Sequence, residues 1–144
     1  MAKISSAEWE VMRVLWTKGE ATSTEITKIL STKQEWSAST VKTLLGRLAD
    51  KGYLTSRREG RTYLYQTLLN EEESNLKAVQ AVLSKICLTK HSQLLGKLIQ
   101  QTPMTKEQIK DLQEILASKE SVERVQCDCQ PGQCHCVSHV EEEK

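Results

Sequence analysis

The clearest structural signal in the chain is the segment Ser37-Ala38-Ser39-Thr40-Val41-Lys42-Thr43-Leu44-Leu45-Gly46-Arg47-Leu48-Ala49-Asp50-Lys51-Gly52. Its aliphatic residues recur with helical spacing and predict one buried face, made of Val41, Leu44, Leu45 and Leu48. Small hydroxyl residues open the segment, and Gly52 suits its end because glycine readily adopts a positive φ. The segment therefore predicts a helix with one apolar face and one polar face.

Two shorter helical patterns precede this segment. In residues 6–16, Trp9, Met12 and Trp16 share helical spacing, and Gly19 follows as a stop signal. Residues 22–25 read Thr-Ser-Thr-Glu, a capping-box pattern that predicts the start of a helix. This helix is expected to run through Leu30, with Ile26, Ile29 and Leu30 as its apolar positions. The sequence thus predicts three consecutive helices with short connections.

The residue pattern changes from helical to strand-like after Gly52. Residues 53–58 and 61–66 alternate in hydrophobicity around Glu59-Gly60, which predicts a β-hairpin. Three helices followed by a hairpin is the order of a winged helix-turn-helix. In that arrangement the third helix enters the DNA major groove and the hairpin, or wing, reaches the flanking backbone.

The third predicted helix and the hairpin both carry candidate DNA contacts. On the polar face of the third helix they are Ser39, Thr40, Lys42, Thr43 and Arg47. On the hairpin they are Arg57, Arg58 and Arg61. Hydroxyl groups can bond phosphates or base edges, whereas lysine and arginine bind phosphates or guanine. A solvated helix face and a protected sheet edge are the alternatives for each residue alone, but the order of elements favours DNA binding.

The second half of the chain predicts further helices. Asn70 can cap a helix whose first turn, residues 71–73, is acidic and complements the helix dipole. A second pattern covers residues 94–99, and a capping box at residues 105–108 opens a third. These helices are rich in Leu and Ile but too small for a confident independent core. Pairing with a second chain is therefore the economical way to bury their apolar faces.

Four of the five cysteines lie in Cys127-Asp128-Cys129-Gln130-Pro131-Gly132-Gln133-Cys134-His135-Cys136. In an extended segment, residues two apart share a face, so each Cys-x-Cys pair presents two sulfurs together. Pro131-Gly132 is a strong turn dipeptide and would bring the two pairs together. The candidate metal ligands are Cys127, Cys129, Cys134 and Cys136. Four thiolates suit one tetrahedral Zn(II) or a compact cluster of Cu(I) with bridging sulfurs.

Other residues near this segment are given simpler roles. Asp128 and His135 alternate with the cysteines and are expected to point away from the sulfurs, and His139 is expected to be solvated. Cys87 is surrounded in sequence by aliphatic residues, so a buried structural thiol is the favoured interpretation.

Charge and composition limit the protein class. Residues 1–67 contain eleven Lys/Arg and seven Asp/Glu, whereas residues 68–144 contain nine and twelve. The basic first half is compatible with nucleic-acid binding. We find no bilayer-length apolar segment and no signal-peptide core. This favours a cytoplasmic protein with reduced thiols and no membrane partner. The sequence shows no pairing of a nucleophile with a base that would suggest an enzyme.

Several of these motifs resemble those of a known family. Residues 9–16, the run Thr-Val-Lys-Thr-Leu-Leu-x-Arg-Leu at 40–48, and Tyr63-Leu64-Tyr65 resemble the BlaI/MecI/PenI winged-helix repressors over about residues 4–118. The cysteine segment resembles that of CopY-type copper-responsive repressors. The resemblance implies a homodimer on an inverted-repeat operator of copper-export genes. It also implies Zn(II) in the DNA-binding form, Cu(I) in the released form, and a copper chaperone as a source of Cu(I).

The predicted fold is mainly α with a small β-hairpin. Its expected parts are a winged helix at residues 1–68, a helical dimerisation region at 69–118 and a flexible metal-binding tail at 119–144. The alternatives are a β-lactam-type repressor inactivated by proteolysis, a thiol metal buffer, and a thiol redox sensor.

Overall fold

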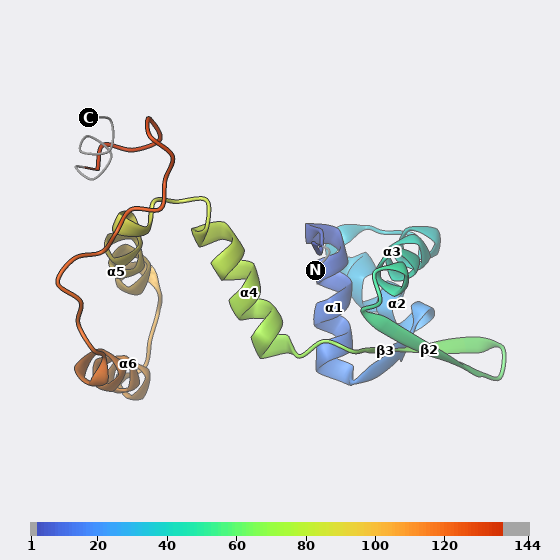
Figure 1. Cartoon of the computed structure of the whole chain (residues 1–144). Coiled ribbons are helices and arrows are strands. Elements are labelled where there is room, and N and C mark those ends of the chain that lie inside the picture. Colours follow the sequence, from blue (N-terminus) through green and yellow to red (C-terminus); the bar gives the residue numbers. More distant parts are fainter. Residues whose placement is uncertain (1–2, 137–144) are drawn as a thin grey trace. The chain divides into compact units, whose positions relative to one another are not determined.

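The computed structural model describes residues 3–136 and has the predicted order of elements (Figure 1). The helices are α1 (Ser6–Lys18), α2 (Ser23–Gln34), α3 (Ala38–Asp50), α4 (Glu71–Leu83), α5 (His91–Gln101) and α6 (Lys106–Ser118), with a short 3-10 helix η1 (Leu88–Lys90). The strands are β1 (Glu20–Thr22), β2 (Leu54–Glu59) and β3 (Thr62–Thr67). The fold is therefore mainly helical with a small sheet, as predicted.

The chain divides into two compact units, one ending at Leu76 and the other beginning at Lys77. The boundary falls inside α4, so the two units share a continuous helix. The division into three parts inferred from the sequence stays a prediction. Among the described residues, no helix has the length and apolarity needed to cross a membrane.

The first unit is built around the apolar faces of α1, α2 and α3. Every aliphatic residue predicted for the buried face of α3 is less than 5% exposed. The largest fully buried side chains are Val11, Met12, Leu15, Ile26, Val41, Leu45 and Leu48. Each such side chain contributes about 1.5–3 kcal/mol through removal from water. This core fixes α3 and leaves its polar face outward.

The hairpin belongs to a three-stranded antiparallel sheet with the order β1-β3-β2. Ala21 of β1 pairs with Tyr65 of β3 and is fully buried. The sequence did not predict β1, because three residues are too few to show an alternating pattern. This strand anchors one side of the wing to the helical core.

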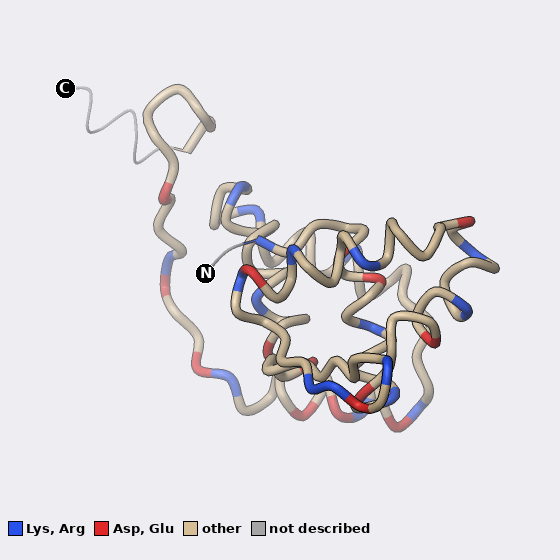
Figure 2. The backbone as a smooth tube through the Cα atoms, turned by 90° about the vertical axis from the view of Figure 1, so that its right-hand side faces the viewer, with Lys and Arg blue, Asp and Glu red and all other residues tan. Residues whose placement is uncertain are grey.

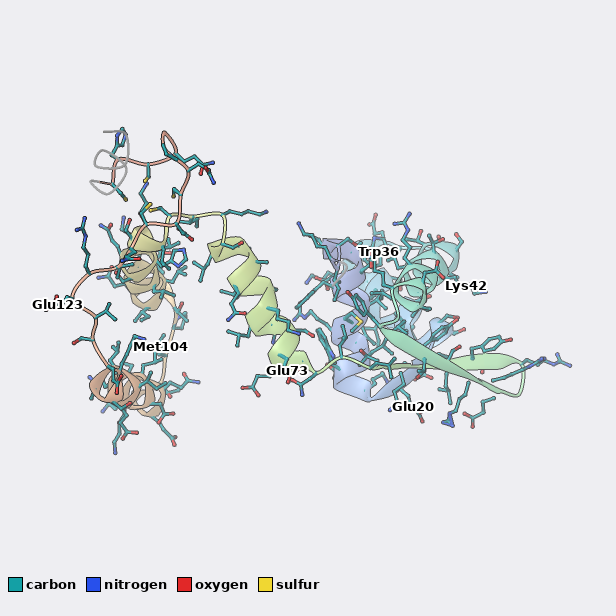
Figure 3. The ribbon with its side chains drawn as sticks, viewed as in Figure 1. Glu20, Trp36, Lys42, Glu73, Met104 and Glu123 are labelled. Atoms are coloured by element: carbon teal, nitrogen blue, oxygen red, sulfur yellow. The ribbon has the colours of Figure 1, made fainter. Side chains whose placement is uncertain are left out.

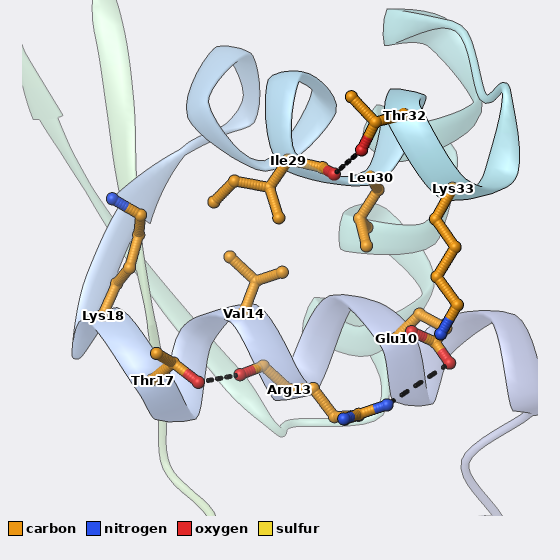
Figure 4. Close-up of a pocket in the computed structure, with 9 residues that line it drawn as sticks. All are labelled: Glu10, Arg13, Val14, Thr17, Lys18, Ile29, Leu30, Thr32 and Lys33. Carbon is orange, nitrogen blue, oxygen red and sulfur yellow. Dashed lines mark hydrogen bonds and ion pairs between the residues drawn. The ribbon is translucent and has the colours of Figure 1, made fainter.

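A groove between α1 and α2 accounts for one departure from the predicted pattern. It has a volume of about 390 Å³ and is lined in part by Val14, Ile29 and Leu30 (Figure 4). Ile29 was counted among the apolar positions of α2 but is 42% exposed, since it faces this open groove. The helix also continues beyond Leu30 to Gln34, and Glu35 ends it with a φ of 56°.

An ion pair with a buried carboxylate joins the start of α1 to the end of α3. Lys51, the C-cap of α3, donates from Nζ to the two carboxylate oxygens of Glu8 at 2.6 and 2.9 Å. The same Nζ donates to the carbonyl of Lys3 at 2.8 Å. Burial raises the pKa of Glu8, but hydrogen bonds from Lys51 and Ser5 and the charge of Lys51 lower it more, so the net shift is downward. The pair thus holds the end of α3 against the start of α1.

We expect Glu8→Gln to reduce the free energy of unfolding by about 2 kcal/mol at neutral pH, because Lys51 loses its carboxylate partner. Since folding lowers the pKa of Glu8, this stabilisation is present above the ordinary value of 4.5 and is lost as the pH falls through the folded-state value. Urea unfolding at neutral pH and at about pH 3 measures the effect, and the two proteins should converge in acid.

Glu10→Gln is the matched control on the same helix. Its partner Arg13 lies 3.8 Å away and is well exposed, so the expected loss is below about 0.5 kcal/mol. An equal loss for both variants, or a loss for Glu8→Gln that does not change with pH, would contradict the role given to the Glu8–Lys51 pair.

Candidate DNA-binding surface and candidate metal centre

The eight predicted DNA contacts are all exposed. Five of them lie on α3 and three on the β2–β3 hairpin. Lys42 extends from the outer side of α3 (Figure 3). Because the aliphatic face of this helix is buried, the exposed face is the one that carries the hydroxyl and basic groups. The structure therefore presents the predicted surface to solvent.

The hydroxyl groups at the start of α3 are ordered by one another. Ser37 Oγ accepts the backbone N–H of Thr40 at 3.3 Å and lies 2.9 Å from Ser39 Oγ. Thr43 Oγ1 donates to the carbonyl of Ser39 at 2.9 Å. The hydroxyl proton of Thr43 is thus engaged, and its oxygen keeps lone pairs that can accept from the amino groups of adenine or cytosine.

The arginines of the wing differ in their partners. Arg57 Nη2 donates to the carboxylate oxygens of Glu20 at 2.9 and 3.1 Å, and Glu59 lies 3.8 Å away. Arg58 Nε donates to the carbonyl of Gly60 at 3.1 Å. Along the backbone tube, Asp and Glu are interspersed with Lys and Arg (Figure 2). The charge of Arg57 is therefore already balanced within the protein, and it fastens the wing to β1.

Four thiols converge in the second unit. The sulfurs of Cys87, Cys127, Cys129 and Cys134 all lie within 4.8 Å of one another. Cys127 Sγ is 3.3 Å from Cys134 Sγ and 3.4 Å from Cys87 Sγ. A tetrahedral site with Zn–S bonds of about 2.3 Å places its sulfurs about 3.8 Å apart. All five cysteines are free thiols, so this donor set fits a soft metal ion.

A tight turn brings the two Cys-x-Cys pairs together. The N–H of Gln133 donates to the carbonyl of Gln130 at 3.0 Å across Pro131-Gly132, and Gly132 has a φ of 94°. The N–H of Cys129 also donates to Cys127 Sγ at 3.4 Å. The turn predicted at Pro131-Gly132 is therefore confirmed, and it folds the segment back so that the sulfurs approach.

The structure adds Cys87 to the group and places Cys136 at its edge. Cys136 Sγ lies 3.6 Å from Cys87 Sγ and 3.4 Å from Thr89 Oγ1. Cys87 is 7% exposed, as expected for a buried thiol. Its neighbours, however, include sulfurs that lie at least forty residues later in the chain. Sequence spacing could not predict this contact, and the one available signal was the presence of a fifth cysteine.

The residues between the cysteines point elsewhere, as predicted. Asp128 Oδ1 accepts the backbone N–H of Leu88 at 3.1 Å and so caps the start of η1. His135 is exposed. The expectation for His139 lies outside the described residues. Asp128 therefore serves as a second attachment between the cysteine segment and the turn after α4.

The thiols influence one another's ionisation. Hydrogen bonds from Thr89 lower the pKa of Cys87 to about 6, although burial opposes this shift. Burial raises the pKa of Cys129 to about 11 and raises that of Cys127 further. Burial raises the pKa of Cys134, but hydrogen bonds from the backbone of Cys136 and from neighbouring thiols lower it more, whereas the pKa of Cys136 is raised. Cys87 and Cys134 thus ionise more readily than the other three thiols. A bound metal ion would displace the thiol protons, as metal–thiolate sites do.

We expect Gly132→Ala to weaken metal binding by about fivefold, because alanine at positive φ costs about 1 kcal/mol in the turn that joins the two pairs. A competition titration of the full chain with Zn(II) and a chromophoric chelator measures this change. Gly96→Ala, within α5 and without a positive φ, is the control and should keep wild-type affinity. Equal affinities for all three proteins would contradict the structural role of the turn.

Comparison with known proteins places the fold within a family. Residues 4–118 match the penicillinase repressor family. The chain is 39% identical to the uncharacterised 16.5 kDa protein of the ptsI 3′ region of Latilactobacillus sakei, over 93% of each chain. It is 28% identical to the methicillin resistance regulatory protein MecI of Staphylococcus aureus, over 81% of this chain and 95% of that protein.

A solved structure is also similar to part of this chain. The DNA-binding domain of the repressor BlaI is 39% identical, with 51% of this chain and 93% of that chain covered and a TM-score of 0.45. The family match covers most of the described residues and ends before the cysteine segment. Relatives in this family are repressors and not enzymes, which agrees with the prediction. The chain therefore belongs to the penicillinase repressor family of winged-helix transcriptional repressors.

Proposed function

We propose that this protein is a copper-responsive repressor. In this proposal a zinc-loaded homodimer binds an inverted-repeat operator of copper-export genes in the cytoplasm, and Cu(I) replaces zinc at the thiols and releases the DNA. The observation that carries the proposal is the convergence of Cys127, Cys129 and Cys134, which lie beyond the family match, with Cys87, which lies within it. A repressor that adds a soft-metal donor set to the family fold is suited to sense a soft metal.

The proposed DNA contacts are those predicted on α3 and the wing. α3 would read the major groove with its ordered hydroxyl groups and with Lys42 and Arg47. Arg58 and Arg61 would meet phosphates beside it. Arg57 would contribute less, because Glu20 already balances its charge.

Exposed aliphatic residues on the helices that follow the wing support the proposed dimer. On α4 they include Val79 and Val82, at 53% and 59% exposure, and on α6 they include Ile115 and Leu116, at 59% and 64%. Apolar surface of this extent is usually covered by a partner. A second copy of the chain would cover it and would pair two winged helices for two half-sites.

Metal exchange can control DNA binding only if the zinc form and the copper form differ in their affinity for DNA. Zinc favours a single tetrahedral set of four ligands, whereas Cu(I) accepts fewer ligands and shares bridging thiolates. The two ions would therefore arrange the same cysteines differently. A copper chaperone is the proposed donor of Cu(I), because free Cu(I) is scavenged by the many thiols of a reducing cytosol.

We expect the zinc-loaded protein to bind tightly to a duplex that it selects from a random DNA pool, and to release that duplex when Cu(I) is added. Fluorescence anisotropy under anaerobic, reducing conditions measures the release. A variant with serine at Cys127, Cys129, Cys134 and Cys136 should no longer respond to Cu(I). DNA that stays bound after Cu(I) has replaced zinc would contradict the proposal.

The same assay separates the alternatives. A β-lactam-type repressor released by proteolysis would bind DNA but ignore Cu(I) with or without the cysteines. A thiol metal buffer would bind metal yet show no salt-dependent binding to any selected duplex. A redox sensor would release DNA on treatment with oxidant in metal-free buffer.

The wing gives a separate prediction on salt dependence. We expect Arg61→Ala to reduce the slope of log affinity against log salt by about one, because one phosphate contact is lost. Arg57→Ala should reduce it less, since Glu20 lies 2.9 Å from its guanidinium. Titrations at several salt concentrations with the selected duplex measure both slopes. Equal reductions for the two variants would contradict the proposed difference between these arginines.

A further inference from the structure

We propose that Cys87 is a metal ligand, that it completes a four-sulfur site with Cys127, Cys129 and Cys134, and that it fastens the cysteine segment to the turn between α4 and α5. This inference rests on the proposed metal-responsive function. It adds a ligand from outside the Cys-x-Cys segment and gives the metal site a physical route to the rest of the chain.

The distances favour Cys87 over Cys136 as the fourth ligand. Cys87 Sγ lies 3.4 Å from Cys127 Sγ and belongs to the group whose sulfurs are all within 4.8 Å of one another. Cys136 falls outside that group, although its sulfur lies 3.6 Å from Cys87 Sγ and 3.4 Å from Thr89 Oγ1. A tetrahedral ion needs four sulfurs at nearly equal separation. The set containing Cys87 meets this requirement with a single small adjustment of each sulfur.

The turn that carries Cys87 is already held by the cysteine segment. Asp128 accepts the N–H of Leu88 at 3.1 Å, directly after Cys87. His91 Nε2 lies 2.8 Å from the carbonyl of Leu83 and 2.9 Å from that of Ile86, so its ring bridges two carbonyls of the same turn. Cys87 is thus held within an ordered turn, where a ligand gains from being fixed before the metal arrives.

The burial of Cys87 also supports its role as a metal ligand. Across residues 77–136, as far as the structure describes them, Cys87 is the one side chain less than a tenth exposed. No described residue of this unit belongs to the buried aliphatic core, so the burial of Cys87 comes with its contacts to the other sulfurs. Metal–sulfur bonds at Cys87 would supply the cohesion that hydrophobic packing does not supply in this unit.

The position of Cys87 also links the site to the repressor. Cys87 lies four residues after the end of α4, and α4 begins two residues after Leu69, whose carbonyl accepts Trp16 Nε1–H at 3.0 Å. One continuous helix therefore leads from the DNA-binding unit to the metal ligand. Cu(I), with its lower coordination number, can be held by the Cys-x-Cys pairs alone. Replacement of zinc would then free Cys87 and loosen the end of α4.

The test compares Cys87→Ser with Cys136→Ser in the full-length protein. Zn(II) affinity is measured by chelator competition, and Co(II) serves as a spectroscopic probe because its thiolate charge-transfer absorption grows with the number of sulfur ligands. We expect Cys87→Ser to lose about a quarter of this absorption and to bind zinc at least about tenfold more weakly. Cys136→Ser should retain the absorption and affinity of the wild type.

Wild-type absorption and affinity in Cys87→Ser would overturn the inference. In that case metal-dependent DNA binding by Cys87→Ser would leave the proposed function standing, whereas a wild-type protein that takes neither Zn(II) nor Co(II) would overturn both. Cys87→His keeps a zinc ligand at this position and should restore affinity in part, which separates lost ligation from lost folding. Failure of Cys87→His to restore affinity, in a protein with wild-type circular dichroism, would also count against ligation by Cys87.

Discussion

The order of the second unit depends on the close approach of cysteine thiols at the turn after α4. Its described helices expose their aliphatic faces, and Cys87 is its one buried side chain among residues 77–136. Fixing a chain of this length costs conformational entropy, which hydrophobic burial normally offsets. Here the burial within one copy is too small, so a metal ion and a second copy of the chain are the two proposed sources of order.

The first unit is held together differently. Three helices bury a continuous aliphatic core, and the Glu8–Lys51 ion pair joins α1 to the end of α3. Capping residues satisfy the helix starts, as at Thr22 and Ser37. This unit needs no ligand to form its DNA-binding surface. A metal signal would therefore act on the placement of two preformed winged helices rather than on the folding of either one.

The helices of the first unit could be predicted from the sequence because helical spacing and caps are local signals. Val41, Leu44, Leu45 and Leu48 are all buried, as their spacing indicated. The strand β1 was missed because it is too short to show a period, and its pairing with β3 is a long-range contact. The Arg57–Glu20 pair was missed for the same reason, since it depends on that sheet.

At the metal centre, too, local features could be predicted from the sequence and long-range contacts could not. The Cys-x-Cys spacing and the Pro131-Gly132 turn predicted the convergence of thiols, because both are local. The approach of Cys87 is not local: it requires the cysteine segment to return to a turn forty residues earlier. The aliphatic neighbours of Cys87 in sequence suggested a packing role, whereas its contacts in space favour a ligand role.

We propose that metal binding at the thiols and DNA binding at the winged helices are thermodynamically coupled. Coupling is reciprocal, so DNA must change zinc affinity by the factor by which zinc changes DNA affinity. The most direct measurement is therefore the zinc affinity of the full-length protein with and without a saturating duplex selected by the zinc form. We expect zinc to bind about five- to 150-fold more tightly when the protein is bound to the duplex. An unchanged zinc affinity would contradict this coupling.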